Sequence, residues 1–96
     1  MKVFLSAQAN SDLLQIDRYL SERSVAGAES IAREISRKFQ NLSDFPFIGR
    51  DRSTLARGLR SVVAPPYVIF YMAEHDRIVI VRVLHGHRDI NTEFQR

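Results

Sequence analysis

The side chains best suited to chemistry lie close together near the C-terminus, in the run His85-Gly86-His87-Arg88-Asp89. An imidazole exchanges a proton near neutral pH, and a guanidinium holds phosphate or carboxylate through a planar pair of donors. With Arg60 and Arg82 as further cations, this cluster could cleave RNA by acid–base catalysis or dock on a protein partner. The structural alternative is that Asp89 pairs with Arg88 or Arg60 while the histidines merely end a strand.

Metal binding is a further alternative for the two histidines. Residues at i and i+2 share a face of an extended chain, so both imidazoles could reach one ion. A zinc site usually needs three or four protein ligands, and Asp89 or His75 would have to complete the set. The chain has no cysteine, which excludes thiolate zinc sites and disulfides. We predict no metal and no cofactor.

A second basic segment lies in the middle of the chain, where Arg50, Arg52, Arg57 and Arg60 are opposed by Asp51. The net charge is +3, and arginine and lysine together number 14. This composition suits an acidic protein or a nucleic acid, and so small a net charge does not choose between them. The structural alternative is a solvated arginine-rich surface.

Length and composition set the class of protein. Ninety-six residues predict one domain, 1–96, with a single modest core. Hydrophobic residues make up 45% and charged residues 26%, which is ordinary for a globular protein. The longest apolar run, residues 67–73, is far shorter than the roughly 20 residues of a transmembrane helix. The N-terminus becomes polar too soon for a secretion signal. We expect a soluble cytoplasmic protein.

Apolar periodicity predicts two helices after a short strand at residues 2–5. Ser6 can cap the first helix, whose apolar stripe ends near Arg23, and Ser24 can cap the second. The second helix must end before Pro46, because the residue before a proline avoids the helical conformation. The connection between the two helices is only about two residues long, and so short a loop predicts that the helices fold back on each other as an antiparallel hairpin. Four apolar side chains lie off the stripes and are expected to be exposed: Leu14, Tyr19, Phe47 and Ile48.

Three strands are predicted to follow, at residues 59–64, 67–72 and 77–84, with a helical turn possible around 53–56. The middle strand is apolar throughout, which is typical of a central strand buried on both faces. The order β-α-α-β-β-β predicts an α+β fold of two layers, with the hairpin on one face of a mostly antiparallel sheet. Successive side chains of a strand point to opposite faces of the sheet. Arg60 is therefore expected on the same face as Val62 and Ala64, and Arg82 on the same face as Ile78, Ile80 and Leu84. Both arginines could then form the floor of a groove on the open face.

Segments in this order resemble the RelE/ParE superfamily, the toxins of bacterial type II toxin–antitoxin systems, and most of all its ParE branch of plasmid stabilisation proteins. The segments are Ala9-Asn10-Ser11-Asp12-Leu13 with Ile16 and Tyr19, Asp44-Phe45-Pro46-Phe47-Ile48-Gly49-Arg50, Gly58-Leu59-Arg60-Ser61, Tyr67-Val68-Ile69-Phe70-Tyr71, and Ile80-Val81-Arg82-Val83-Leu84-His85-Gly86-His87-Arg88-Asp89-Ile90. The family has the β-α-α-β-β-β fold predicted above.

The resemblance implies a toxin that inhibits DNA gyrase and arrests growth, is not an enzyme, and is neutralised by a ParD-like antitoxin of the ribbon-helix-helix type. Direct binding of nucleic acid is disfavoured, though not excluded. The candidates for contact with the target are Arg60, Arg82, His85, His87, Arg88 and Asp89. The candidates for contact with the antitoxin are Leu14, Tyr19, Phe47, Ile48, Arg50, Arg52 and Arg57.

Two alternatives stay open: a RelE-like, ribosome-dependent mRNA endonuclease and an inactive homologue that only binds the antitoxin. In the ribonuclease, the catalytic set would be His85, His87, Arg88 and Arg60. Only Arg88 matches the basic residues of that branch, because Val68, Ala56 and Gly58 stand where its other cations are expected. Phe94 stands near its tyrosine and has no hydroxyl to exchange a proton. These differences favour the gyrase-directed toxin.

Overall fold

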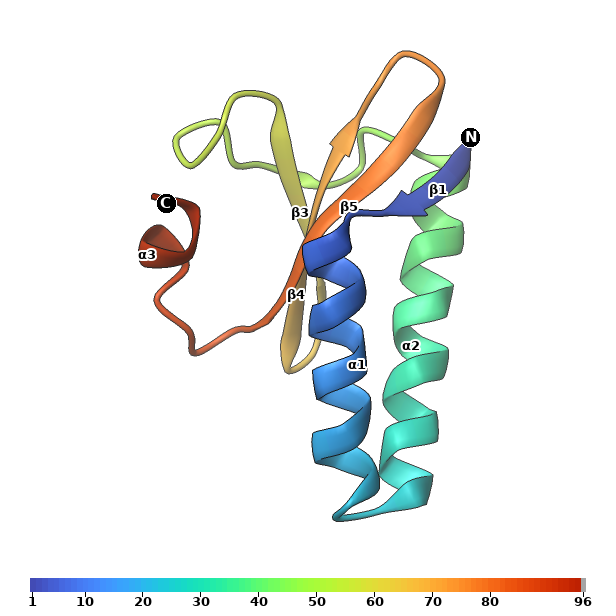
Figure 1. The fold of residues 1–96 in the computed structure, drawn as a ribbon. Helices are drawn as coiled ribbons and strands as arrows, with labels where there is room; N and C mark the ends of the chain where they lie inside the picture. Colours follow the sequence, from blue (N-terminus) through green and yellow to red (C-terminus); the bar gives the residue numbers. More distant parts are fainter. Residues whose placement is uncertain (96) are drawn as a thin grey trace.

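Two antiparallel helices cover one face of a five-stranded sheet in the computed structural model, which describes residues 1–95 (Figure 1). The predicted α+β architecture is confirmed. Along the chain the elements are β1 (Lys2–Leu5), α1 (Ala7–Ser21), α2 (Val25–Asp44), β2 (Arg50–Asp51), β3 (Leu59–Ala64), β4 (Tyr67–Ala73), β5 (Arg77–His85) and α3 (Ile90–Phe94). Within residues 1–95, none of the helices has the length and hydrophobicity that crossing a membrane requires.

The strands lie in the order β1-β5-β4-β3-β2, with β1 parallel to β5 and the other neighbours antiparallel. The predicted central strand is β4, and its residues from Tyr67 to Tyr71 are all buried. The two predicted serine caps are also present. Ser6 Oγ accepts a hydrogen bond from the Ala9 amide at 3.0 Å, and Ser24 Oγ accepts one from the Gly27 amide at 3.0 Å.

The main core lies between the sheet and the helical hairpin. Its buried side chains include Ala9 of α1, Ile35 of α2, and Ile69 and Tyr71 of β4. The helices contribute the apolar stripes that the periodicity predicts, because residues three and four apart share one helix face. This core fixes α1 against β5, which brings the N-terminal half of α1 beside the end of that strand.

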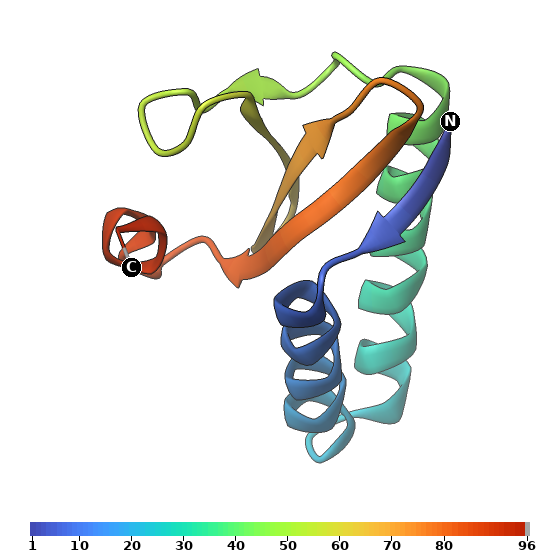
Figure 2. The same cartoon turned by 45° about the horizontal axis from the view of Figure 1, so that its top comes forward.

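The element order predicts that the other face of the sheet is partly open, but a second layer of apolar residues covers much of it. Leu59, Val68, Phe70 and Leu84 form a second buried cluster there. It is covered by Leu55 and Ala56 of the turn after β2 and by Ile90 and Phe94 of α3. Figure 2 shows α3 on the side of the sheet away from α1 and α2. This face is more covered than expected because the turn after β2 and helix α3, which carry too little local signal to be predicted, bring apolar residues to it.

Gly49 lies where the loop after α2 meets the sheet. The buried Tyr71 hydroxyl donates to the Pro46 carbonyl at 2.8 Å and accepts a hydrogen bond from the Gly49 amide at 2.9 Å. A Cβ at position 49 would lie 2.5 Å from that hydroxyl oxygen and 2.9 Å from the Ser61 carbonyl oxygen. No side chain fits there without moving the backbone.

We expect Gly49→Ala to lower the free energy of unfolding by about 1–3 kcal/mol or more, as overpacking typically does. Urea denaturation monitored by circular dichroism measures the change. Gly27→Ala is the matched control: its Cβ meets only the Ser24 side chain, at 3.3 Å, in the first turn of α2. Alanine favours a helix over glycine, so this control should keep or raise stability. Equal stability losses in the two variants would contradict the prediction.

Candidate functional site

The end of β5 departs from regular alternation. Phe70 lies opposite Arg82 while the next residue, Tyr71, lies opposite Ile80, so Val81 is the extra residue of a β-bulge. After the bulge Val83 faces the main core and Leu84 faces the second cluster. The expectation that Arg82 and Leu84 share a face with Ile78 and Ile80 is therefore wrong, because one inserted residue reverses the alternation.

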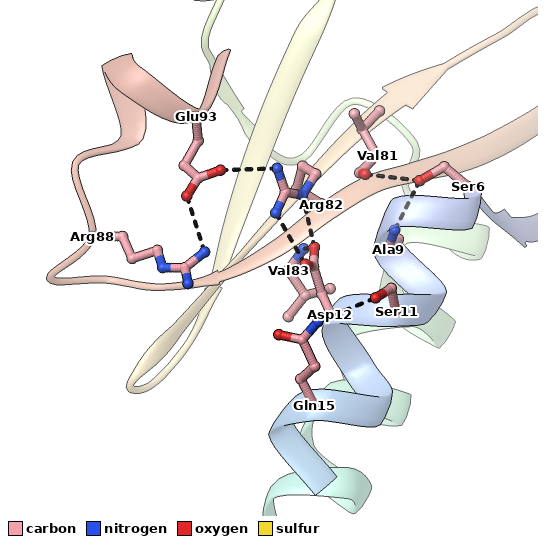
Figure 3. A network of polar contacts seen from close by, with 10 residues as sticks. All are labelled: Ser6, Ala9, Ser11, Asp12, Gln15, Val81, Arg82, Val83, Arg88 and Glu93. Atoms are coloured by element: carbon pink, nitrogen blue, oxygen red, sulfur yellow. Dashed lines mark hydrogen bonds and ion pairs between the residues drawn. The ribbon is translucent and has the colours of Figure 1, made fainter. Parts of the chain in front are cut away.

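Arg82 is held in an ion-pair network rather than exposed in a groove (Figure 3). Its Nε and Nη2 donate to the two Asp12 carboxylate oxygens at 2.9 and 3.0 Å, and its Nη1 donates to Glu93 Oε2 at 3.1 Å. The side chains of Arg82 and Asp12 are only 13% and 11% exposed. The hydrogen bonds that Arg82 donates to the Asp12 carboxylate raise the pKa of Arg82. The network links α1, β5 and α3.

Ser6, the N-cap of α1, and Asp12 within α1 also complete the edge of β5. Strand β1 ends at Leu5, opposite Ile80, so it cannot pair with β5 beyond that point. Ser6 takes over: its amide donates to the Ile80 carbonyl at 2.9 Å and its Oγ donates to the Val81 carbonyl at 2.8 Å. The Val83 amide donates to Asp12 Oδ2 at 3.0 Å. Sequence reasoning did not assign this role to Asp12, because its partners lie about 70 residues away.

Arg60 lies on the opposite face of the sheet from Arg82. It is paired with Tyr71, whose side chain belongs to the main core, whereas Arg82 is paired with Phe70 of the second cluster. The Arg60 guanidinium donates to the Phe47 and Gly49 carbonyls at 3.3 and 3.0 Å and lies over the Phe47 ring. The expected groove floor shared by the two arginines does not form.

The run from His85 to Asp89 leaves the sheet as a turn that leads into α3. The His85 ring meets Tyr67 edge-on at 5.6 Å and stacks on His87 at 5.1 Å, and its Nδ1 accepts a hydrogen bond from the His87 amide at 3.1 Å. Arg88 is half exposed at 51% and donates to Glu93 Oε1 at 3.0 Å. About half of its side chain therefore faces solvent.

Asp89 has a structural role that differs from the expected one. Its carboxylate accepts hydrogen bonds from the Thr92 hydroxyl at 2.7 Å and the Thr92 amide at 3.3 Å, which caps α3 and lowers the pKa of Asp89. The suggested pairing of Asp89 with Arg88 or Arg60 is wrong, because Arg88 pairs with Glu93 and Arg60 with backbone carbonyls. Within residues 1–95, no three His, Asp or Glu side chains are placed to hold a metal ion.

A groove of about 530 Å³ runs between α1 and the end of β5. It brings together Tyr19, a candidate for antitoxin contact, with His85 and Arg88, candidates for target contact. We call it the α1/β5 groove; its lining is Asp12, Gln15, Ile16, Tyr19, Leu20, Pro66, Tyr67, Val83, Leu84, His85 and Arg88. Burial raises the pKa of Tyr67 above its ordinary value.

The remaining candidates lie outside this groove. As expected, Leu14, Phe47 and Ile48 are exposed, at 62%, 64% and 62%. Phe45 is equally exposed, at 64%, and was not predicted as part of a site. Two members of the basic segment, Arg50 and Arg57, face solvent. Arg52 is engaged in the fold, because its Nε donates to Ser61 Oγ at 2.9 Å and its guanidinium lies over the Phe70 ring.

Comparison with known proteins decides the family. Residues 3–90 match the family model described as the ParE toxin of the type II toxin–antitoxin system parDE. The chain belongs to the ParE toxin family. Toxin ParE3 of Caulobacter vibrioides is 32% identical over 90 residues, which cover 93% of this chain and 90% of that toxin. The resemblance inferred from the sequence is thereby confirmed.

A solved structure extends the agreement to the fold of this ParE-family chain. The structure titled "Chromosomal ParDE TA system from P. aeruginosa" superposes with a TM-score of 0.72 at 19% identity. The match covers 88% of this chain and 95% of that one. At so low an identity the likeness speaks for the fold, and it agrees with the helical hairpin and mostly antiparallel sheet described above.

Proposed function

We propose that this ParE-family toxin inhibits DNA gyrase without cleaving RNA and is neutralised in the cytoplasm by a ParD-like antitoxin. The family match over residues 3–90 carries this proposal, since it spans nearly the whole chain. The name of the P. aeruginosa ParDE system adds support for a paired antitoxin. The half-exposed Arg88 is the clearest contact for the target, because it lies in the turn after β5 and pairs with Glu93 through one nitrogen, which leaves guanidinium donors for a partner.

The packing of the second cluster argues against ribonuclease activity. Val68, which stands where that branch has a cation, is buried with Phe70 and Leu84. Phe94, near the position of the expected tyrosine, packs on Phe70 with ring centroids 4.9 Å apart. These side chains hold α3 on the sheet and have no group that binds phosphate or moves a proton.

Two assays on the purified toxin and on induced cells separate the alternatives. We expect gyrase supercoiling to be inhibited and the DNA-damage response to be induced, with no new mRNA cuts on translating ribosomes. Specific mRNA cuts that His87→Ala abolishes would overturn the proposal in favour of the endonuclease. Normal growth together with tight antitoxin binding would instead identify an inactive homologue.

The exposed basic segment predicts how the antitoxin associates. An antitoxin segment that neutralises a toxin with this surface should carry acids, and ion pairs at an interface rim mainly affect association rate and its salt dependence. We expect Arg57→Glu to slow association severalfold at low salt while dissociation changes little. Arg57 is a better probe than Arg52, which binds Ser61. Surface plasmon resonance with the antitoxin measures both rates.

Arg33→Glu is the control for this prediction, because Arg33 is an exposed arginine of α2 and the charge change is the same. Its effect on association should be clearly smaller. If the two variants associate equally fast at low salt, the basic segment is not where the antitoxin docks.

A further inference from the structure

The loop between α2 and β2 holds three large apolar side chains out of the fold. Phe45, Phe47 and Ile48 are exposed by 64%, 64% and 62%. The loop runs from the end of α2 to β2, the edge strand of the sheet (Figure 2). Monomers rarely expose contiguous apolar surface beyond a few hundred Å², and such surface marks contacts with other molecules. Residues 45–48, which we call the apolar loop, are therefore a candidate interface.

The apolar loop has a firmly held backbone. The buried Tyr71 hydroxyl joins the Pro46 carbonyl to the Gly49 amide. The Arg60 guanidinium donates to the Phe47 and Gly49 carbonyls. The exposed side chains are thus presented on an ordered backbone, and a partner that covers them loses little binding energy to ordering the loop.

The shape of the apolar loop fits a second copy of itself. An open hollow of about 420 Å³ is lined by Asp44, Phe45, Pro46, Phe47 and Ile48. The exposed phenylalanine rings therefore project beside an apolar hollow. A two-fold interface brings the same surface of both copies together, so that surface must carry both the projection and its receptacle. The apolar loop carries both.

The charges at the two ends of the loop also favour a second copy. Asp44 precedes the apolar loop and Arg50 follows it after Gly49, and both are exposed. Within residues 1–95, neither of them takes part in an ion pair. When two such loops lie antiparallel about a two-fold axis, Asp44 of each copy lies beside Arg50 of the other. A partner of one sign would complement only one end.

We propose that this chain forms a two-fold homodimer through the apolar loop, with Phe45 and Ile48 packed into the hollow of the other copy and Asp44 paired with Arg50 across the axis. The three apolar side chains expose on the order of 400 Å² per copy, taking about 200 Å² for each whole side chain. A standard interface buries roughly 800 Å² per partner. The dimer is therefore weak, with a dissociation constant on the order of 10 µM. Phe47 and Ile48 then serve a second copy rather than the antitoxin.

Sedimentation velocity on the free protein, diluted from about 500 to 1 µM, covers the range of a weak dimer. Phe45→Ser and Ile48→Ser should each raise the dissociation constant about tenfold, as loss of an apolar anchor does. Val25→Ser is the matched control, because Val25 is also 64% exposed but lies at the other end of α2. It should leave the dissociation constant unchanged. Circular dichroism melting checks that every variant is folded.

Charge reversal tests the antiparallel pairing separately. Asp44→Arg or Arg50→Asp alone places like charges across the axis and should weaken the dimer severalfold. An equal mixture of these two variants should dimerise again, because each pair across the axis is then of opposite sign. No recovery on mixing overturns the pairing of Asp44 with Arg50.

Two outcomes overturn the dimer itself. One is an unmodified protein that stays monomeric over the whole dilution series. The other is a control, Val25→Ser, that weakens association as much as Ile48→Ser. If the protein is monomeric and Ile48→Ser instead weakens binding of the antitoxin encoded beside this chain, the apolar loop belongs to the antitoxin interface.

Discussion

Replacing Asp12 with alanine is expected to lower the free energy of unfolding by about 3–5 kcal/mol, the usual cost of removing one partner from a buried ion pair. The substitution takes two hydrogen bonds from Arg82 and leaves it with Glu93 alone. It also leaves the Val83 amide without its acceptor at the edge of β5. Thermal and urea denaturation should show the loss as a lower melting temperature and a lower urea midpoint.

Two further variants show whether this loss comes from the uncompensated Arg82 charge. Asp17→Ala removes an exposed acid from the same helix and should change stability by about 0.5 kcal/mol or less. The double variant Asp12→Ala, Arg82→Met should recover part of the loss, because no unpaired charge is then buried. The single variant Arg82→Met completes the comparison. If this substitution lowers stability as much in the Asp12→Ala protein as it does in the unmodified protein, the two residues act independently and the prediction is wrong.

The larger elements could be predicted because their signals are local. Ser6 and Ser24 can cap helices wherever they stand before an apolar stripe, and β3 through β5 begin or end at prolines and charged turns. The boundaries of these strands agree with the structure to within one residue. The two elements that were not predicted, β2 and α3, have two and five residues and depend on partners distant in the sequence.

The candidate site was harder to predict because one residue decides it. The bulge at Val81 turns Arg82 away from the face that strict alternation gives it, and nothing in the local sequence marks that insertion. Arg82 then meets Asp12 across about 70 residues, which makes it part of the fold. Arg88 lies beyond the last strand and is half exposed. Its assignment as a contact residue is compatible with the structure and stays a prediction.

Arg88→Ala is expected to abolish growth inhibition while the protein stays folded. If Arg88 anchors a carboxylate or phosphate of the target in a buried contact, its loss costs on the order of a hundredfold in affinity. Its pair with Glu93 is exposed on the Arg88 side and contributes about 1 kcal/mol or less to stability. The melting temperature should therefore change little, and Glu93 keeps its hydrogen bond to Arg82. Antitoxin affinity should fall no more than severalfold, because an ion pair made by a half-exposed side chain contributes little to affinity.

Arg77→Ala is the matched control for this test. Arg77 lies at the other end of β5, is 49% exposed, and also pairs with a single acid, Glu74, at 2.8 Å. It resembles Arg88 in charge and exposure but is not among the residues that line the α1/β5 groove. Growth inhibition, thermal melting and antitoxin affinity should be measured on both variants, with Arg77→Ala expected to stay toxic. If Arg88→Ala loses toxicity only in proportion to a lower melting temperature, Arg88 acts through the fold. If it stays fully toxic with an unchanged melt, Arg88 contacts no target.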